Sequence, residues 1–329
     1  MRLLTRSDIQ QTLSMQEAVK VVERAFIELS TGSAVVPLRT ALPQPRHDGV
    51  TLVMPGYLAN ADALAVKIVS IHNGNPQLSL PRIHALVIVI DPTTGIPIAA
   101  MEGGYLTALR TGAASGVATD WLARKDAEVA AIFGAGAQAR TQMLAVAAVR
   151  PIKRFWVYAR HRKTVEALIA EMRPQFDSIE LLAAASPAQA VCEADVICAA
   201  TTSLTPVFDG NDLKPGVHIN GVGSYHRTMQ EIDCVTLRSA SRIVVDQREP
   251  ALSEAGDLIV AIERGQIQAS DVYAEIGEIA AGLKVGRERQ EEITYFKSVG
   301  NAAQDVAVAQ AVYQRALSNS LGVEIEMAG

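Results

Sequence analysis

The sequence predicts an α/β protein in which a doubly wound parallel sheet is inserted into an α+β domain. Two observations predict this architecture. From residue 129 onward, short apolar strands alternate with helices, as they do in βαβ units. Before residue 121 the chain instead has the pattern of an amphipathic helix followed by apolar strands and a second helix. We assign the last helix, 301–318, to this first part, so the expected domains are residues 1–120 with 301–329, and residues 121–300.

The first domain is expected to open with a helix over residues 14–32. Ser14 and Glu17 have the spacing of a capping box, apolar residues follow at helical spacing, and Gly32 is a stop signal. Apolar runs then predict four strands, and an Ala-rich run predicts a closely packed helix. The strands are expected at residues 50–55, 64–71, 83–91 and 96–102, and the helix at residues 105–123.

The second domain is expected to alternate strand and helix. Strands are predicted at residues 129–133, 154–158, 179–183, 195–200, 216–222 and 241–246, and helices at residues 137–149, 163–173 and 186–193. A helical stretch at residues 250–265 and a strand-like stretch at residues 293–300 complete the domain. Parallel strands joined by helices form a sheet that is covered on both faces, which is the doubly wound arrangement.

Composition favours a compact protein that handles small metabolites. Of 329 residues 49% are hydrophobic, and the formal net charge of -5 provides no basic field for nucleic acid or an anionic membrane. No window approaches the roughly 18 unbroken apolar residues of a membrane span, and the first ten residues lack the apolar core of a signal peptide. Three cysteines without CxxC spacing fit free thiols, so we expect a cytoplasmic protein. The six histidines show no short ligand spacing, so no metal is expected.

A glycine motif indicates a nucleotide site. Gly134-x-Gly136-x-x-Ala139 comes directly after a predicted strand and opens a predicted helix. Gly134 permits a tight turn, Gly136 lets the backbone approach a diphosphate, and Ala139 lets the helix pack on the strand. The same pattern occurs in glycine turns that bind nothing. Its place at the first strand–helix turn of the alternation favours a Rossmann-like dinucleotide site.

The end of the next strand indicates which dinucleotide is bound. Residues 155–163 read "FWVYARHRK", so Ala159 stands where a carboxylate would bind the ribose hydroxyls of NAD. Arg160 and Arg162 offer guanidinium groups that suit the 2′-phosphate of NADP. NADPH (NADP) is therefore the expected cofactor, with NADH less favoured. The alternative is that this basic run is a solvated helix start.

Six motifs resemble the ornithine cyclodeaminase/μ-crystallin family, in the same order and over nearly the whole chain. They are residues 67–76, 106–118, 133–139, 194–208, 254–258 and 296–309. The resemblance implies a homodimer that acts on a small imino or amino acid. It also implies that the first domain, completed by the C-terminal helix, binds the substrate and forms the dimer, while the Rossmann-like domain binds the cofactor.

The resemblance assigns individual residues. Lys67 and Arg110 match family positions that bind the substrate carboxylate, and Arg39 matches a further arginine. An α-imino or α-amino acid needs its carboxylate neutralised by fixed cations beside the nicotinamide, so Lys67 and Arg110 are the expected catalytic residues as well. Other positions resemble the family's cofactor contacts, namely Thr111, Ala137, Gln138, Thr201, Thr202, Val222 and Ser298.

One position departs from the cyclodeaminase pattern. Cyclodeaminases and the related alanine dehydrogenase carry an Asp shortly after the fifth strand, where it handles the substrate amino group, and Tyr225 stands there in this chain. Cyclisation of ornithine needs an acid or base beside the nitrogen. Reduction of a preformed cyclic C=N bond needs mainly a charge clamp and positioning. We therefore expect an NADPH-dependent reductase of cyclic ketimines, Δ1-pyrroline-2-carboxylate or Δ1-piperideine-2-carboxylate, that gives L-proline or L-pipecolate.

Alternatives remain at this stage. The first is an ornithine cyclodeaminase or an NAD-dependent amino-acid dehydrogenase of the same family. The second is a μ-crystallin-like protein that binds a small ligand without turnover. The proton donor also stays open, with Tyr225, His226, His72 and water as candidates.

Overall fold

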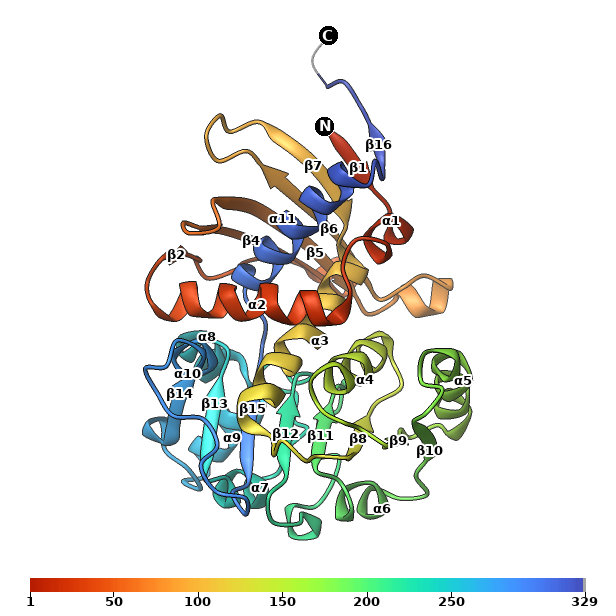
Figure 1. The fold of residues 1–329 in the computed structure, drawn as a ribbon, viewed down its shortest axis with the longest axis vertical. Coiled ribbons are helices and arrows are strands. Elements are labelled where there is room, and N and C mark those ends of the chain that lie inside the picture. Colours follow the sequence, from red (N-terminus) through yellow and green to blue (C-terminus); the bar gives the residue numbers. More distant parts are fainter. Residues whose placement is uncertain (328–329) are drawn as a thin grey trace. The chain divides into compact units, whose positions relative to one another are not determined.

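The computed structural model describes residues 1–327, which divide into two compact units (Figure 1). The first unit contains Met1–Arg110 and the chain from Asn301 onward, and the second contains Thr111–Gly300. The expected boundary at residue 120 and this division both fall within one helix, α3 (Gly103–Leu122). Residues 328–329 of the expected first domain lie outside the described range.

The first unit is built on one eight-stranded sheet. Its strands are β1 (Arg2–Leu4), β2 (Ala34–Val35), β3 (Thr40–Gln44), β4 (Gly49–Leu58), β5 (Ala63–His72), β6 (Ile83–Ile90), β7 (Pro97–Glu102) and β16 (Val323–Glu324). The order is β16-β1-β7-β6-β5-β4-β2, and β3 also pairs with β4. The four predicted strands are confirmed as β4 to β7, which pair antiparallel in sequence order.

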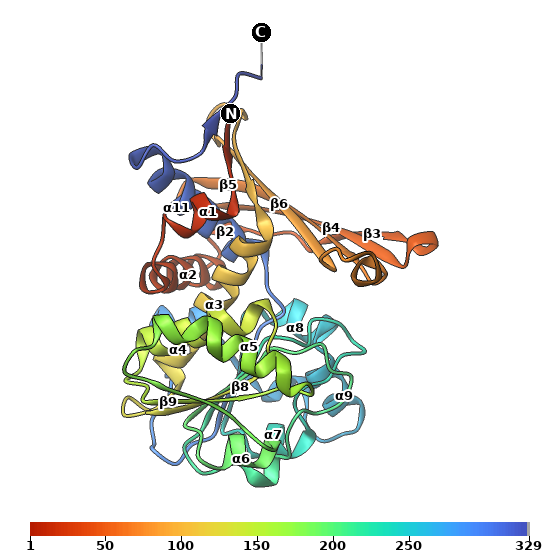
Figure 2. The same ribbon diagram turned by 90° about the vertical axis from the view of Figure 1, so that its right-hand side faces the viewer.

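Helices cover one face of this sheet. The helices of the first unit are α1 (Arg6–Gln10), α2 (Met15–Ser30), the start of α3, and α11 (Ala302–Ser318). Figure 2 shows α2 and α11 on the same side of the strands. A Cβ atom on Gly56 of β4 would lie 3.0 Å from Val306 of α11, so the helix packs closely on the strand because this position has no side chain.

The predicted boundaries of α2 are confirmed. The Ser14 hydroxyl accepts a hydrogen bond from the Glu17 backbone N–H, and the Glu17 carboxylate accepts one from the Ser14 backbone N–H. This is the capping box that the sequence predicted. The helix stops just before Gly32, which adopts a φ of +81° that favours glycine.

The second unit contains the predicted doubly wound sheet. Its strands are β8 (Val129–Phe133), β9 (Arg154–Tyr158), β10 (Glu180–Ala183), β11 (Val196–Ala199), β12 (His218–Gly221), β13 (Arg242–Val245), β14 (Val272–Glu275) and β15 (Thr294–Lys297). All pairs are parallel, in the order β10-β9-β8-β11-β12-β15-β13-β14. The order reverses beside β8, and the crevice outside the strand ends at such a switch point is where dinucleotides bind.

Helices and apolar cores lie on both faces of this sheet. The helices are the remainder of α3, α4 (Ala137–Val149), α5 (Arg162–Met172), α6 (Pro187–Cys192), α7 (Cys234–Ser239), α8 (Arg248–Glu254), α9 (Gly256–Glu263) and α10 (Ile276–Ala280). Ala131 and Phe133 of β8 belong to one buried cluster, whereas Ala130 and Ile132 belong to another. Since successive residues of a strand point to opposite faces, the two clusters are the cores of the two faces.

The prediction of a single helical stretch at residues 250–265 is wrong in one respect. The structure breaks it at Ala255 into α8 and α9. A Cβ atom on Gly256 would lie 2.0 Å from the carbonyl oxygen of Met229, so the chain here packs against a segment that is distant in sequence. The spacing of apolar residues within 250–265 does not predict this packing.

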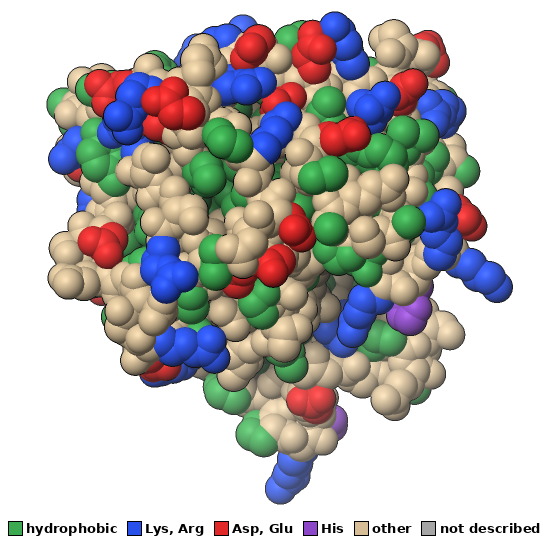
Figure 3. Space-filling model, turned by 90° about the horizontal axis from the view of Figure 1, so that it is seen from below, with side chains coloured by type: hydrophobic (Ala, Val, Ile, Leu, Met, Phe, Trp, Pro, Cys, Tyr) green, Lys and Arg blue, Asp and Glu red, His purple; other side chains and the backbone are tan. Residues whose placement is uncertain are grey.

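Within residues 1–327 no helix is both long and apolar enough to cross a membrane. On the face of the molecule seen in Figure 3, Lys and Arg side chains are interspersed with Asp and Glu. That face therefore presents both signs of charge side by side.

Candidate active site

The three residues predicted to bind the substrate carboxylate lie on different elements of the first unit. Lys67 is on β5, Arg110 is on α3, and Arg39 directly precedes β3. Lys67 lies on the helix-covered face of β5, because side chains alternate along a strand and its neighbours on that face, Ala65 and Val69, are buried too. Lys67 and Arg110 are only 2% and 6% exposed. Cations are seldom buried so deeply unless they are paired.

Asp305 of α11 joins the two buried cations. Its Oδ2 accepts a hydrogen bond from Lys67 Nζ at 2.6 Å, and its Oδ1 accepts one from Arg110 Nε at 3.0 Å. Arg110 Nη1 also donates to Gln304 Oε1 at 2.8 Å. Two buried positive charges thus share one negative charge, and we call these four residues the cation cluster. Its excess positive charge suits an anionic group of a ligand.

The surroundings of Lys67 disfavour its charged form. Burial lowers the pKa of Lys67 from 10.5 to about 8. Asp305 opposes this shift, whereas repulsion from Arg110 and Arg39 adds to it. The half-buried Arg39 therefore acts on the same ammonium group. A bound carboxylate would relieve the repulsion among these cations.

Sequence reasoning did not assign roles to Asp305 and Gln304. Both lie in a motif that carried the family resemblance, but nothing in their spacing links them to Lys67. A signal was nevertheless present, since Asp305 is the one charged residue among residues 302–313 of the predicted helix, and a buried carboxylate needs a cation. The amide Nε2 of Gln304 and Nδ2 of Asn301 are buried and have no partner among the described residues. They are donors available to a ligand.

The glycine turn of the second unit has the geometry of a diphosphate site. Gly134 has a φ of +105°, and a Cβ atom on it would lie 2.6 Å from the carbonyl oxygen of Ala200. A Cβ atom on Gly136 would meet no atom within 4 Å, so packing within the chain does not require a glycine at this position. Open space above Gly136 and the free N–H groups of Ala137 and Gln138 at the start of α4 fit a diphosphate. Ala139 is fully buried, as the predicted helix–strand contact requires.

The basic run lies at the carboxyl end of β9. Ala159 is half-buried, and Arg160 and Arg162 are exposed. Arg162 Nε donates to Glu166 Oε1 at 3.0 Å along α5, whereas Arg160 makes no hydrogen bond or ion pair within residues 1–327. The two arginines are therefore not equivalent, and Arg160 is the one available to a ligand.

The other predicted cofactor positions differ in exposure. Thr202 is exposed, Thr201 is half-buried, and Thr111, Val222 and Ser298 are buried. The Ser298 hydroxyl donates to Asp246 Oδ2 at 2.8 Å, so its own side chain is engaged. Thr111 accepts a bond from Gln142 Nε2 at 3.4 Å through its carbonyl.

The candidate proton donors are spread over both units. Tyr225 is half-buried beside the core of the second unit. His226 is exposed, and its Nδ1 pairs with Thr228 Oγ1 at 3.0 Å. His72 ends β5 and is half-buried.

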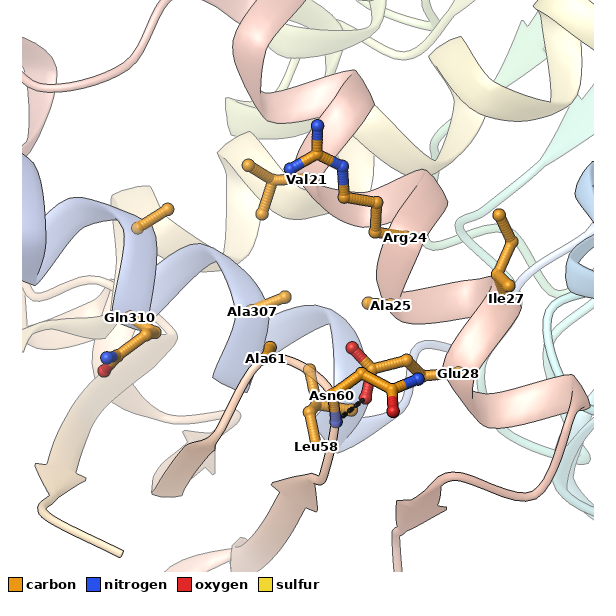
Figure 4. A pocket seen from close by; sticks show the side chains of 11 residues that line it. Val21, Arg24, Ala25, Ile27, Glu28, Leu58, Asn60, Ala61, Ala307 and Gln310 are labelled. Carbon is orange, nitrogen blue, oxygen red and sulfur yellow. Dashed lines mark hydrogen bonds between the residues drawn. The ribbon is translucent and has the colours of Figure 1, made fainter.

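A separate pocket of about 430 Å³ opens between α2, α11 and residues 58–61 (Figure 4). Its lining is mainly apolar, and the carboxylate of Glu28 there accepts the Asn60 backbone N–H at 2.9 Å. Neither Lys67 nor Arg110 lines it. The pocket is therefore distinct from the cation cluster.

A turn that fits a dinucleotide, in a chain that also buries a cation cluster suited to a carboxylate, defines an oxidoreductase that uses a pyridine nucleotide. Comparison with known proteins narrows this class. The sequence profile of the ornithine cyclodeaminase/mu-crystallin family matches residues 1–320, and the chain belongs to this family.

Relatives of known name span the whole chain. A Δ1-pyrroline-2-carboxylate reductase of Bacillus cereus is 38% identical over 99% of this chain and 100% of its own length. The structure of Thermococcus litoralis Δ1-pyrroline-2-carboxylate reductase in complex with NADH and L-proline is 45% identical, with a TM-score of 0.95 over 99% of this chain and 100% of that chain. An archaeal alanine dehydrogenase dimer with bound NAD is 37% identical, with a TM-score of 0.92 over 100% of this chain and 99% of that chain.

Proposed function

We propose that this protein reduces cyclic ketimines that carry a carboxylate, Δ1-pyrroline-2-carboxylate and Δ1-piperideine-2-carboxylate, to L-proline and L-pipecolate, with NADPH preferred over NADH. The observation that carries the proposal is the cation cluster of Lys67, Arg110, Gln304 and Asp305. It offers two cations to a carboxylate, and Tyr225 stands where cyclodeaminases carry the Asp that handles the substrate amino group. The names of the Bacillus cereus and Thermococcus litoralis relatives support the same substrate class.

The chain's own residues have defined tasks in this reaction. Arg110 and Lys67 bind the carboxylate and fix the ring of the substrate, while Asp305 holds both cations in place. The unpartnered amide Nε2 of Gln304 donates to the same carboxylate. When bound, the reduced nicotinamide supplies the hydride for the imine carbon. A fixed pose is the main requirement because the C=N bond is already formed.

The preference for NADPH rests on Arg160. It is an exposed guanidinium just after β9 with no ion-pair partner within residues 1–327, and Ala159 offers no carboxylate to the ribose hydroxyls. A guanidinium forms strong hydrogen bonds to a phosphate. The Thermococcus relative is described with NADH, so both nucleotides must be compared directly.

A spectrophotometric assay of NADPH and NADH oxidation tests the proposal. The panel contains five- and six-membered cyclic imino acids, and pyruvate with ammonia. We expect turnover of the cyclic imino acids and, in a separate incubation with oxidised nucleotide, no ammonia from ornithine or lysine. Efficient conversion of ornithine to proline would instead identify a cyclodeaminase. Efficient amination of pyruvate would identify an amino-acid dehydrogenase, and binding without any turnover would identify a ligand-binding protein.

The lowered pKa of Lys67 predicts a pH dependence. Below about pH 8 Lys67 is protonated and helps to bind the carboxylate, and above this value the positive charge is lost. We therefore expect kcat/KM, which reports the free enzyme, to fall as the pH rises through about 8. The control is Lys67→Arg, whose guanidinium stays charged. A fall at the same pH in this variant would assign the titration to another group, such as the substrate imine.

We also propose a homodimer formed through the uncovered face of the first unit's sheet. Val53, Ile68 and Leu86 stand opposite one another on β4, β5 and β6. Val66, two residues before Ile68, pairs with Ile88, two residues after Leu86, on the same face. These five residues form an apolar area on the face, and Leu86 is 43% exposed. Antiparallel sheets normally present polar residues on a solvated face. A second copy of the same sheet would bury these side chains.

Ile68→Glu is expected to convert the dimer into a monomer, because it places a carboxylate at the centre of the apolar face. Size-exclusion chromatography with light scattering distinguishes a 35.1 kDa chain from twice that mass. Leu283→Glu is the matched control, since Leu283 is 64% exposed in the second unit. A wild-type monomer, or an Ile68→Glu variant that remains dimeric, contradicts the proposed interface.

The cytoplasm is the compartment we propose. Cys192, Cys198 and Cys234 are all free thiols in the structure, which supports a reducing environment.

A further inference from the structure

One buried carboxylate ties together the ends of two neighbouring strands in the second unit. Glu231 is fully buried. Its Oε1 accepts the Thr201 backbone N–H at 2.5 Å, and its Oε2 accepts those of Gly223 at 2.7 Å and Ser224 at 2.9 Å. Thr201 follows β11, and Gly223 follows β12. Glu231 therefore fixes both loops at the carboxyl edge of the sheet.

Glu231 is itself held by a second layer of buried groups. Its backbone N–H donates to Asp257 Oδ1 at 2.7 Å. Asp257 Oδ2 accepts from Lys297 Nζ at 2.7 Å and from the Tyr295 hydroxyl at 3.3 Å. Lys297 and Asp257 are both fully buried. Since Lys297 ends β15, the network reaches a third strand of the same edge.

The network formed by Glu231, Asp257 and Lys297 carries two carboxylates and one ammonium group. Three backbone N–H groups donate hydrogen bonds to the Glu231 carboxylate, an arrangement that fits its ionised form. Burial and repulsion from Asp257 raise the pKa of Glu231, while Lys297 and the hydrogen bonds from Thr201 act in the opposite direction. With Glu231 ionised, the network has one uncompensated negative charge.

The position of this charge is significant in a doubly wound sheet. The two halves of such a sheet each bind one nucleotide of the cofactor. The glycine turn and Arg160 follow β8 and β9, so this half takes the adenosine. The other half, β11, β12 and β15, takes the nicotinamide, and Glu231 underlies the ends of β11 and β12.

We propose that Glu231 is a positioning residue for the nicotinamide half of the cofactor and that its buried charge favours the oxidised, positively charged ring over the neutral reduced ring. Such a charge stabilises the positive charge that develops on the ring as it gives up its hydride. The inference deepens the proposed function and rests on it only in requiring a pyridine nucleotide.

Isothermal titration of NADP+ and NADPH into Glu231→Gln tests the inference without turnover. We expect NADP+ affinity to fall more than NADPH affinity, so that the ratio of the two dissociation constants changes by about 3- to 30-fold. Glu231→Asp keeps the charge but shortens the side chain, so it should weaken both nucleotides and leave the ratio near the wild-type value. In steady-state assays Glu231→Gln should lower kcat more than it raises KM for the imino acid.

Asp195→Asn is the matched control. Asp195 is also a buried carboxylate that bridges two strands, since its Oδ2 accepts the N–H groups of Glu128 at 2.9 Å and Val129 at 3.0 Å. It lies at the amino ends of β8 and β11, away from the nucleotide edge. This variant should lower thermal stability and leave the NADP+/NADPH ratio unchanged.

If Glu231→Gln does not fold, Asp257→Asn provides the second test, because it removes the other negative charge and should shift the ratio in the same direction by a smaller factor. The inference would be overturned if these variants lost equal affinity for NADP+ and NADPH. It would also be overturned if Asp195→Asn shifted the ratio of the two dissociation constants as much as they do. A wild type that binds both nucleotides but reduces no cyclic imino acid would refute the proposed substrate and leave the role of Glu231 intact.

Discussion

Replacement of Arg110 by alanine is expected to lower kcat/KM for a cyclic imino acid by roughly 30- to 1000-fold, which corresponds to about 2–4 kcal/mol of lost transition-state stabilisation. The reason is that Arg110 is buried and its guanidinium is already oriented by Asp305 and Gln304. A charge-assisted hydrogen bond in such a site is stronger than one at the surface. The measurement is steady-state kinetics on the best substrate of the panel.

Two controls separate lost binding from lost structure. Arg110→Lys keeps the charge but loses the fixed fork of donors, so it should retain part of the activity. NADPH affinity, measured by titration, should change much less than kcat/KM because Arg110 is assigned to the substrate. Near-wild-type kcat/KM in Arg110→Ala on every accepted substrate would remove Arg110 from the active site.

Arg160→Ala is expected to weaken NADPH binding by about 10- to 150-fold, since a hydrogen bond to a charged group contributes about 1.5–3 kcal/mol. NADH lacks the 2′-phosphate, so its binding should barely respond. Combining Arg160→Ala with Ala159→Asp should move the preference towards NADH, because the new carboxylate repels the phosphate and accepts the ribose hydroxyls. The measurement is kcat/KM for both nucleotides at fixed ionic strength.

Arg162→Ala is the control within the same basic run. Arg162 already pairs with Glu166, so its loss should change the NADPH/NADH ratio less than the loss of Arg160 does. Added salt should weaken the Arg160 contact, as expected for an exposed charge pair. The preference for NADPH is wrong if the wild type favours NADH, or if neither alanine variant changes the ratio.

Long periodic elements were predictable from the sequence, whereas short and long-range features were not. The capping box of Ser14 and Glu17 lies within four residues and specifies the start of α2 by itself. The edge strands β1 and β16 contain three and two residues, too few to show an alternation. The break at Ala255 depends on the approach of Gly256 to Met229, which no local pattern encodes.

The candidate site was predictable where one residue carries its own chemical signal. Gly134 and Gly136 lie in a local motif, whereas Lys67 and Arg110 were assigned through their match to family positions. Asp305 could not be assigned because its role depends on Lys67, which lies 238 residues away in the sequence. The difference between Arg160 and Arg162 was also inaccessible, because it depends on which arginine Glu166 engages in the folded chain.

The order in which a ribosome makes this chain determines when the cation cluster can assemble. Lys67 and Arg110 are synthesised early, and they lack their counter-ion until α11 brings Asp305. The second unit is continuous from Thr111 to Gly300, so all of its sequence has been made before α11 begins. Domains generally fold as units during synthesis, with the N-terminal one first. Here the unit that contains the N-terminus must finish folding last, so the cation cluster of a nascent chain stays incomplete until α11 has left the ribosome.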